Sequence, residues 1–424
     1  MAREIILQKL PVGWSYNLLD NIAERCSGHT PSKSFPEYWN GGIKWISLAD
    51  SCRLDKGYVY ETDKEISLEG IKNSSAEVHP AETVVLSRDA GVGKSGVMAT
   101  PMAVSQHFIA WKCDNKEKLH SWYLYNWLQL NKEEFERQAV GSTIKTIGLP
   151  YFKKLRIAVP PFDEQKKIAQ ILSTWDKAIS VTEKLLTNSQ QQKKALMQQL
   201  LTWKKRLLDE NGVRFSGEWE YTIFGNLGDT YTGLTGKTKE DFGAGKPYIP
   251  YINIFKNSRI DIQNLEYVQV NDDERQSVVK YGDIFFTTSS ETPEEVGMSS
   301  VLLEEVSEVF LNSFCFGFRL NNFETLIPKY ARYLFRSEHV RRQISTLGQG
   351  VTRYNLSKRQ LIKLELKLPC VEEQQKIAAV LSAADAEIST LEKKLTCLRD
   401  EKKALMQQLL TGKRRVKVDE AVAE

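Results

Sequence analysis

The sequence predicts an α+β protein in which two mixed α/β domains are separated by two long helices that form an antiparallel coiled coil with pseudo-twofold symmetry. Three observations predict this class. A long segment occurs twice, the apolar residues of both copies follow a heptad spacing, and the stretches between the copies alternate short β-like runs with turns.

The repeat is the strongest of these signals. Residues Glu164–Arg206 and Glu373–Arg415 align without a gap at an offset of 209, and 26 of the 43 aligned positions are identical. The block KKALMQQLLT is the same at Lys193–Thr202 and at Lys402–Thr411. A duplication of half the chain, and not a solenoid of short repeats, therefore organises the protein.

Similarity extends weakly upstream at the same offset, where Gly141–Ile147 lies opposite Gly350–Leu356. Between these anchors the halves diverge, and segments 28–140 and 233–349 share a layout but few residues. Two like segments and two unlike ones indicate a common frame with two different working ends.

Heptad spacing identifies the constant segments as helices. Apolar residues of the second copy alternate four and three positions apart, interrupted only at Lys402, and the first copy keeps this register with Thr182 and Ser189 midway. Each helix is expected to run about 60 Å at about 1.5 Å per residue. One such helix cannot bury its own seam, so we expect the two to pair, and chain order favours an antiparallel pair. The alternative is that each helix packs only on its own domain.

These segments set the expected domain boundaries. They are a first variable domain at 1–155, a central helix at 156–210, a second variable domain at 211–365, a distal helix at 366–415 and a flexible tail at 416–424.

The variable domains are expected to mix strands and helices. Candidate strands are Ile43–Leu48, Thr83–Arg88, Ser105–Lys112, Tyr248–Ile254, Asp283–Thr288 and Phe314–Leu320, and candidate helices are Leu119–Asn131 and Lys329–Ser345.

Loops of the variable domains join aromatic residues with basic and small polar ones. Lys, Arg, Ser, Thr and Gly-rich backbone suit phosphate contact, and Asn, Gln and Arg can read base edges. The net charge of +4 is too small to indicate nucleic-acid binding by itself. For any single residue, an ordinary solvated turn is an equally good interpretation. As a set, the residues expected to bind DNA are Thr30, Ser32, Lys33, Lys44, Arg88, Lys94, Ser95, Ser142, Thr143, Lys145, Thr235, Lys237, Thr238, Lys239, Asn253, Lys256, Gln349, Thr352, Arg353, Tyr354 and Asn355.

The Lys- and Gln-rich ends of the constant segments predict two equivalent docking sites for two copies of one partner. The residues expected there are Lys193, Lys194, Met197, Gln198, Lys402, Lys403, Met406 and Gln407.

Several motifs that would indicate chemistry are incomplete. The GK[ST] cores at Gly93–Ser95 and Gly236–Thr238 lack the first Gly of a phosphate-binding loop, where Arg88 and Tyr231 stand. VPPF at Val159–Phe162 resembles an amino-methyltransferase motif, but Val159 cannot accept a hydrogen bond from an amine. We therefore expect no catalytic residue.

Cysteines and histidines are dispersed along the chain. The six cysteines form no CxxC pair, which argues against a zinc site or a disulfide framework and for a reducing compartment. No signal-peptide region and no apolar run of about 18 residues occurs, so a cytoplasmic protein with no metal site is expected.

The duplicated helix entries PPFDEQKKIAQILSTWDKAI and LPCVEEQQKIAAVLSAADAEI, with the twin KKALMQQLLT ends, closely resemble the specificity subunits of type I restriction–modification enzymes. The resemblance covers nearly the whole chain. It implies two target-recognition domains, each reading one half of a bipartite, asymmetric DNA sequence, and a coiled coil that binds two modification (methyltransferase) subunits. Restriction subunits join the complex through the modification subunits. The resemblance does not identify which residues of this sequence read bases, because the recognition segments vary within this family.

The same resemblance implies that this chain binds no cofactor, and that other subunits of the complex use S-adenosylmethionine, ATP and Mg²⁺. Two other functions stay open at this point. One is a coiled-coil scaffold whose variable domains bind protein, and the other is an enzyme that uses the GK[ST] loops.

Overall fold

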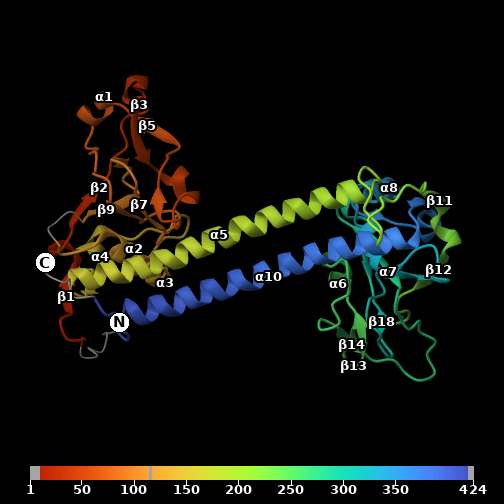
Figure 1. The fold of residues 1–424 in the computed structure, drawn as a ribbon. Helices are drawn as coiled ribbons and strands as arrows, with labels where there is room; N and C mark the ends of the chain where they lie inside the picture. Colours follow the sequence, from red (N-terminus) through yellow and green to blue (C-terminus); the bar gives the residue numbers. More distant parts are fainter. Residues whose placement is uncertain (1–9, 114–116, 419–424) are drawn as a thin grey trace. The chain divides into compact units, whose positions relative to one another are not determined.

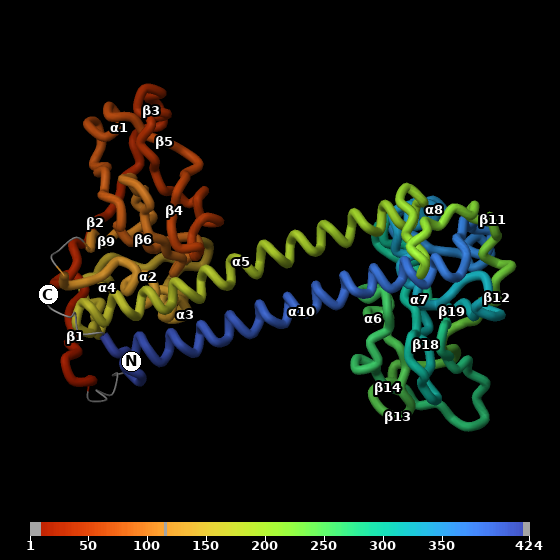
Figure 2. The backbone as a smooth tube through the Cα atoms, in the orientation of Figure 1, coloured from red at the N-terminus to blue at the C-terminus, as the bar shows by residue number. Residues whose placement is uncertain are grey.

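A computed structural model describes residues 10–113 and 117–418, which divide into two compact units. Of these residues, unit 1 contains 10–113, 117–183 and 393–418, and unit 2 contains 184–392. Each unit contains one variable segment and a part of each long helix, as the colouring by residue number shows (Figures 1 and 2). Part of the predicted tail, 419–424, lies outside the described residues.

Unit 1 is built on a five-stranded sheet with the order β2-β9-β6-β7-β4. Its strands are β2 (Glu24–Ser27), β9 (Phe108–Lys112), β6 (Val84–Ser87), β7 (Ser95–Met98) and β4 (Tyr58–Val59). A second sheet consists of β5 (Lys64–Ile66), β3 (Trp39–Ile46) and β8 (Ala103–Val104), and β1 (Ser15–Leu18) pairs with β10 (Arg156–Val159). The shorter helices are α1 (Leu68–Lys72), α2 (Ser121–Leu130), α3 (Lys132–Gln138) and α4 (Leu149–Lys153).

Strand β6 is buried along its whole length because both faces of the sheet are covered. Leu86 on one face joins the core that α2 supplies with Tyr123 and Leu128, while Val85 on the other joins a separate cluster with Phe108. Residues of both long helices complete the first core, together with Leu410 directly after α10. The helix residues are Ile168, Leu172, Met406 and Leu409.

Unit 2 repeats this plan. Its central sheet has the order β12-β19-β15-β17, and its second sheet the order β14-β13-β18. The strands are β11 (Glu220–Ile223), β12 (Gly228–Thr232), β13 (Phe242–Ile249), β14 (Glu266–Val268), β15 (Ile284–Thr287), β16 (Ser289–Ser290), β17 (Ser299–Val301), β18 (Phe310–Leu311), β19 (Cys315–Leu320), β20 (Tyr354–Asn355) and β21 (Glu365–Leu368). The shorter helices are α6 (Tyr251–Lys256), α7 (Pro328–Leu334), α8 (Glu338–Thr346) and α9 (Lys358–Leu361).

The correspondence between the units extends to irregular features. Strand β3 is antiparallel to β5 and parallel to β8, and β13 has the same relations to β14 and β18. Both β3 and β13 carry a register shift at their glycine-containing first half. The variable segments therefore share a fold although they share few residues.

The long helices are α5 (Phe162–Leu200) and α10 (Val371–Leu409), each of 39 residues. Helix α5 begins directly after Pro161 and α10 begins two residues after Pro369, and each carries two acidic residues in its first turn, which suits the positive end of the helix dipole. The seam position Thr182 is buried with its hydroxyl bonded to the Ala178 carbonyl, and the buried Ser189 hydroxyl donates to Glu387.

Pairing of the two helices is antiparallel within each unit. In unit 1, Glu164 pairs with Arg415 and Asp176 with Lys402, so residue numbers rise along α5 as they fall along α10. Unit 2 shows the same order in the pairs Lys193–Asp385 and Arg206–Glu373. The predicted α+β class with antiparallel helices is confirmed.

Several predicted element boundaries are wrong. Helices α5 and α10 begin later than 156 and 366 because Arg156–Val159 and Glu365–Leu368 are strands that pair with β1 and β11. The strand predicted over Tyr248–Ile254 ends at Ile249, since Pro250 has no amide hydrogen for a sheet and instead precedes α6.

The helix predicted over Lys329–Ser345 is two helices, α7 and α8. The chain turns between Leu334 and Glu338, where the Ser337 hydroxyl accepts from the Val340 amide and caps α8. The strand predicted over Ser105–Lys112 begins only at Phe108, whose amide bonds to the Ser105 carbonyl in a turn.

Candidate nucleic-acid interface

In unit 1, two loops that the sequence singles out lie together at the end of β6. The Ile147 amide donates to the Arg88 carbonyl at 2.9 Å. Val140 and Thr146 exchange two backbone hydrogen bonds of 3.0 and 2.9 Å, which close a short hairpin. At its tip Ser142, Thr143 and Lys145 are exposed, so the structure brings these three predicted residues together beside Arg88.

Unit 2 contains the equivalent arrangement at the end of β15. Gln349 and Asn355 exchange two backbone hydrogen bonds of 3.0 and 2.9 Å, and the Leu356 amide donates to the Thr288 carbonyl at 2.8 Å. Thr352 and Arg353 are exposed at the tip. The predicted residue Tyr354 is half-buried and packs against the core of unit 2.

Lys94 and Ser95 do not belong to this surface. The Lys94 ammonium donates to the hydroxyl and carbonyl of Ser51 at 2.8 and 3.3 Å. Ser95 is fully buried in β7, and its hydroxyl accepts from Gln129 at 2.8 Å. Burial removes Ser95 from the residues available to DNA, and this corrects the prediction at that position.

The remaining predicted residues of unit 1 lie on the second sheet and the loop before it. Ser32 and Lys33 are exposed, and the Thr30 hydroxyl donates to Gln106. The Lys44 ammonium bonds to the Tyr60 carbonyl and pairs with Glu61 at 3.0 Å. Of these residues, Lys33 presents its charge to solvent most directly.

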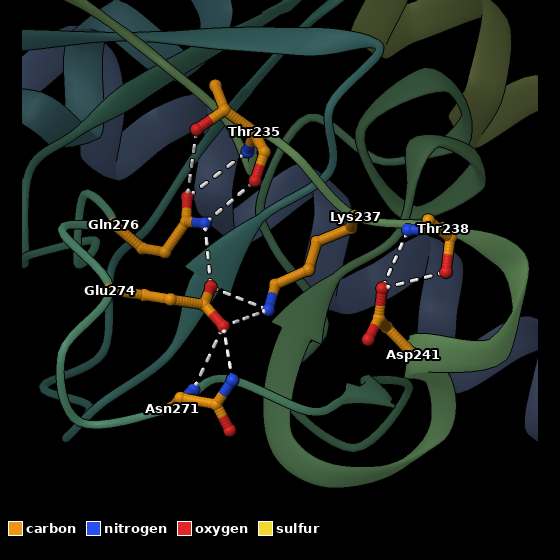
Figure 3. Close-up of polar contacts among 7 residues, drawn as sticks. All are labelled: Thr235, Lys237, Thr238, Asp241, Asn271, Glu274 and Gln276. Carbon is orange, nitrogen blue, oxygen red and sulfur yellow. Dashed lines mark hydrogen bonds and ion pairs between the residues drawn. The ribbon is translucent and has the colours of Figure 1, made fainter.

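Figure 3 shows how the GLTGKT loop of unit 2 is held by polar contacts. The Lys237 ammonium pairs with Glu274 at 2.6 Å and its side chain is only 5% exposed. The side chain of Gln276 accepts from the Thr235 amide at 3.1 Å and donates to its carbonyl at 2.8 Å. Lys237 therefore holds the loop to residues 271–276, and its charge is not free for a nucleotide or a DNA phosphate.

The neighbouring residues of this loop differ in exposure. Thr238 forms a reciprocal cap with Asp241, in which the Thr238 amide donates to the carboxylate at 2.7 Å. Lys239 is exposed. Donation from Lys237, then from Gln276 and the Asn271 amide, lowers the pKa of Glu274 from 4.5 to about 2, so this carboxylate is charged at neutral pH.

Asn253 is also a structural residue. It is 3% exposed, its amide group donates to the Asp261 and Asn264 carbonyls at 2.9 Å, and its carbonyl oxygen accepts from the Asp261 amide. The prediction of a DNA contact at Asn253 is corrected for the same reason as at Ser95.

Lys256 is exposed at the rim of an open cleft of about 1620 Å³ in unit 2. The cleft lies between residues 256–263, α7 and one face of α10. Two of its arginines are already paired, Arg259 with Glu304 and Arg332 with Asp385. Positive charge therefore does not dominate its walls.

Sequence reasoning missed two half-buried arginines that position loops. Arg336 donates to four backbone carbonyls, including those of Ile254 and Asn257, and Arg341 donates to the carbonyls of Glu294, Val296 and Gly297. Burial lowers the pKa of each to about 10, so both stay charged. The cluster RSEHVRR carries no signal that separates these arginines from the exposed Arg342.

Several of the residues predicted to dock a partner have contacts within their own unit. Lys193 pairs with Asp385, and Lys402 pairs with Asp176. The two ion pairs are equivalent, because both the lysines and the aspartates align at the offset of 209. Met406 is 8% exposed in the core of unit 1, and Met197 packs against the core of unit 2. For these four residues, internal packing explains the identity of the two copies.

The other members of that set are exposed. Lys194, Gln198, Lys403 and Gln407 lie on the outer face of α5 or α10, and Gln198 donates to Glu338 at 3.0 Å.

Residues 10–113 and 117–418 hold no group of three or more His, Cys, Asp or Glu side chains placed to bind a metal ion. All six cysteines are free thiols. Within the described parts of the chain, no helix is both long and apolar enough to cross a membrane.

A family model described as the type I restriction modification DNA specificity domain matches the chain twice, over residues 11–188 and 217–397. The MjaVIII specificity subunit of a type I restriction enzyme from Methanocaldococcus jannaschii is 25% identical over 390 residues, covering 85% of this chain and 87% of the relative. The EcoKI specificity subunit from Escherichia coli K12 is 22% identical over 410 residues, covering 91% and 85%.

Solved structures show the same fold at low identity. The S subunit of a type I restriction–modification system from M. genitalium is 15% identical, covers 94% of this chain and 96% of its own, and has a TM-score of 0.56. A chain from a study of assembly and conformational transition of the type I system is 16% identical, covers 96% and 100%, and has a TM-score of 0.58.

These relatives are specificity subunits, so the prediction of a specificity subunit that is not itself an enzyme is confirmed. With two matched domains that together span most of its length, the chain belongs to the type I restriction modification DNA specificity family.

Proposed function

We propose that this chain gives a type I restriction–modification complex its DNA sequence specificity by binding a bipartite, asymmetric sequence, one half per recognition domain. The observation that carries the proposal is the contrast between frame and loops. Both units present a hairpin beside the end of a central strand, while the exposed side chains around it differ. A common frame with unlike surfaces suits two unlike half-sites.

The proposal includes two modification subunits, docked on equivalent surfaces of the paired helices. Support comes from Lys194 and Gln198 on α5 and from Lys403 and Gln407 on α10, which are exposed and identical at the offset of 209. Restriction subunits would join through the modification subunits. The modification and restriction subunits would use S-adenosylmethionine, ATP and Mg²⁺, and this chain would bind none of the three. A cytoplasmic location, expected from the dispersed cysteines, belongs to the same proposal.

Selection of binding sites from a random duplex library tests the proposal. The full chain, assembled with its modification subunit, is expected to enrich two short fixed blocks separated by a spacer of constant length, with different sequences in the two blocks. The selection is run at moderate salt, because low salt favours phosphate attraction without sequence preference. Absence of any enriched sequence would contradict the proposal and favour a scaffold whose variable domains bind protein.

A further inference from the structure

We infer that the two tip hairpins, residues 140–146 in unit 1 and 349–355 in unit 2, contact DNA phosphates and do not read bases. The inference rests on the proposed function and assigns a role within it. The hairpins occupy aligned positions, since 140 and 349, like 146 and 355, differ by 209.

The backbone of the two hairpins is the same. Each is closed by a reciprocal pair of hydrogen bonds of 3.0 and 2.9 Å, between Val140 and Thr146 and between Gln349 and Asn355. Each is tied to the loop after a central strand, through the Ile147 amide and the Leu356 amide.

Both hairpins also require glycine at the same position. Gly141 and Gly350 have φ of 132° and 140°, which residues with a side chain rarely adopt. A Cβ at Gly141 would lie 2.2 Å from the Ile144 carbonyl oxygen, and one at Gly350 would lie 1.9 Å from that of Arg353. The conformation is therefore kept in two domains whose other loops have diverged.

Each tip exposes polar and cationic side chains together with one apolar side chain, Ile144 or Val351. Thr143 and Thr352 are identical at the offset of 209 and exposed, and each tip carries one exposed cation, Lys145 or Arg353. In residues 10–113 and 117–418, neither cation forms an ion pair. The apolar side chain of Val351 is 89% exposed, which packing within the chain does not explain.

Sameness between the hairpins decides between the two kinds of DNA contact. A base-reading loop must differ between unlike half-sites, whereas the sugar–phosphate backbone is the same at both. The cation occupies neighbouring but not identical aligned positions. This shift matters little for a point charge near a phosphate, but it would change a bidentate contact to a base.

The double variant Lys145→Ala, Arg353→Ala tests the assignment in the full chain with its modification subunit. Affinity is measured against the selected duplex and a scrambled duplex over a range of salt concentrations. We expect both affinities to fall by the same factor, about two- to fivefold per cation, as for an exposed charge pair. The slope of log affinity against log salt should shrink by about 0.9 per lost contact.

Two further variants sharpen the result. Arg353→Lys keeps the positive charge, so the variant should bind DNA like the parent if Arg353 contacts a phosphate. If Arg353 instead made a bidentate contact to guanine, that contact would be lost. Lys118→Ala and Lys363→Ala remove exposed lysines elsewhere on the same units and should change neither affinity nor slope.

Each alternative outcome is distinct. Unchanged affinity and slope in the double variant would overturn the contact. Loss confined to the selected duplex, or a new preferred base in one block, would show base reading and overturn the assignment. Failure of the parent chain to select any sequence would overturn the proposed function and the assignment with it.

Discussion

Single residues at identical positions of the two constant segments have equivalent contacts. Glu164 and Glu373 are 2% and 0% exposed, and each accepts two hydrogen bonds from one guanidinium, that of Arg415 or Arg206. A buried carboxylate without such a partner is strongly unfavourable. The repeat is therefore preserved at these residues by internal charge pairing as well as by any shared partner.

Replacement of Glu373 tests this explanation. Glu373→Ala leaves Arg206 without its carboxylate and the Trp219 indole without its acceptor at 3.2 Å, so we expect a loss of about 3 kcal/mol in the free energy of unfolding. Urea unfolding of the full chain measures it. The exposed neighbour Glu372→Ala is the control, with an expected loss below about 1 kcal/mol. Equal losses in the two variants would contradict a special role for the buried pair.

Glu274 provides a pH-dependent prediction. The pKa of Glu274 is lowered to about 2, chiefly by Lys237. The Glu274–Lys237 contact therefore stabilises the folded state fully above pH 4.5, and this stabilisation is lost as the pH falls toward 2. In Lys237→Met the pKa of Glu274 should return toward 4.5. The measurement is NMR titration of ¹³C-labelled glutamate carboxyls between pH 6 and 4. Titration of the parent Glu274 within that window would contradict the contact.

At the scale of elements, a buried glutamine connects the start of each long helix to its domain. The Gln165 side chain donates to the Pro160 and Lys118 carbonyls and accepts from the His120 amide. Gln374 does the same with Pro369, Thr325 and Ile327. Each glutamine thus joins a helix entry to the start of a helix in the variable segment.

Removal of this amide should loosen one unit only. Gln374→Ala leaves three backbone groups at the helix entry without their side-chain partner, and we expect a cost of about 1–3 kcal/mol. Hydrogen exchange at the Ile327 amide should accelerate, while exchange at His120 stays unchanged. The exposed Gln375→Ala is the matched control. Faster exchange in both units would contradict a local role.

At the scale of the whole molecule, the chain combines two like frames with two unlike surfaces. We expect the two half-sites to be read independently, because the loops proposed to contact DNA belong to one unit or the other.

Exchange of residues 216–360 for the corresponding segment of a relative tests this independence. One block of the selected DNA sequence should change to that of the relative, and the other block and the spacer should stay the same. A replacement of similar length within the same family, with the helices untouched, keeps the fold. Changes in both blocks would contradict independent recognition.

The repeat, the heptad seam and the alternation of short strands are local or exactly periodic, so the sequence by itself determined the fold class, the duplication and the family. It also singled out the two loops that form the tip hairpins, because GSTIKTI and GVTRYNL keep their spacing, but the hairpin pairing itself comes from the structure. Element ends were less predictable where strand pairing with a distant segment competed with helix formation, as at Arg156–Val159.

Only the tertiary structure decided which polar side chains are free. Lys237 and Lys145 are both lysines in glycine-containing loops, yet the first is paired with Glu274 and the second is exposed. Lys193 is paired with a carboxylate that lies far away in the sequence, at Asp385. Whether a charge faces solvent depends on partners brought in by the fold, and no local pattern contains that information.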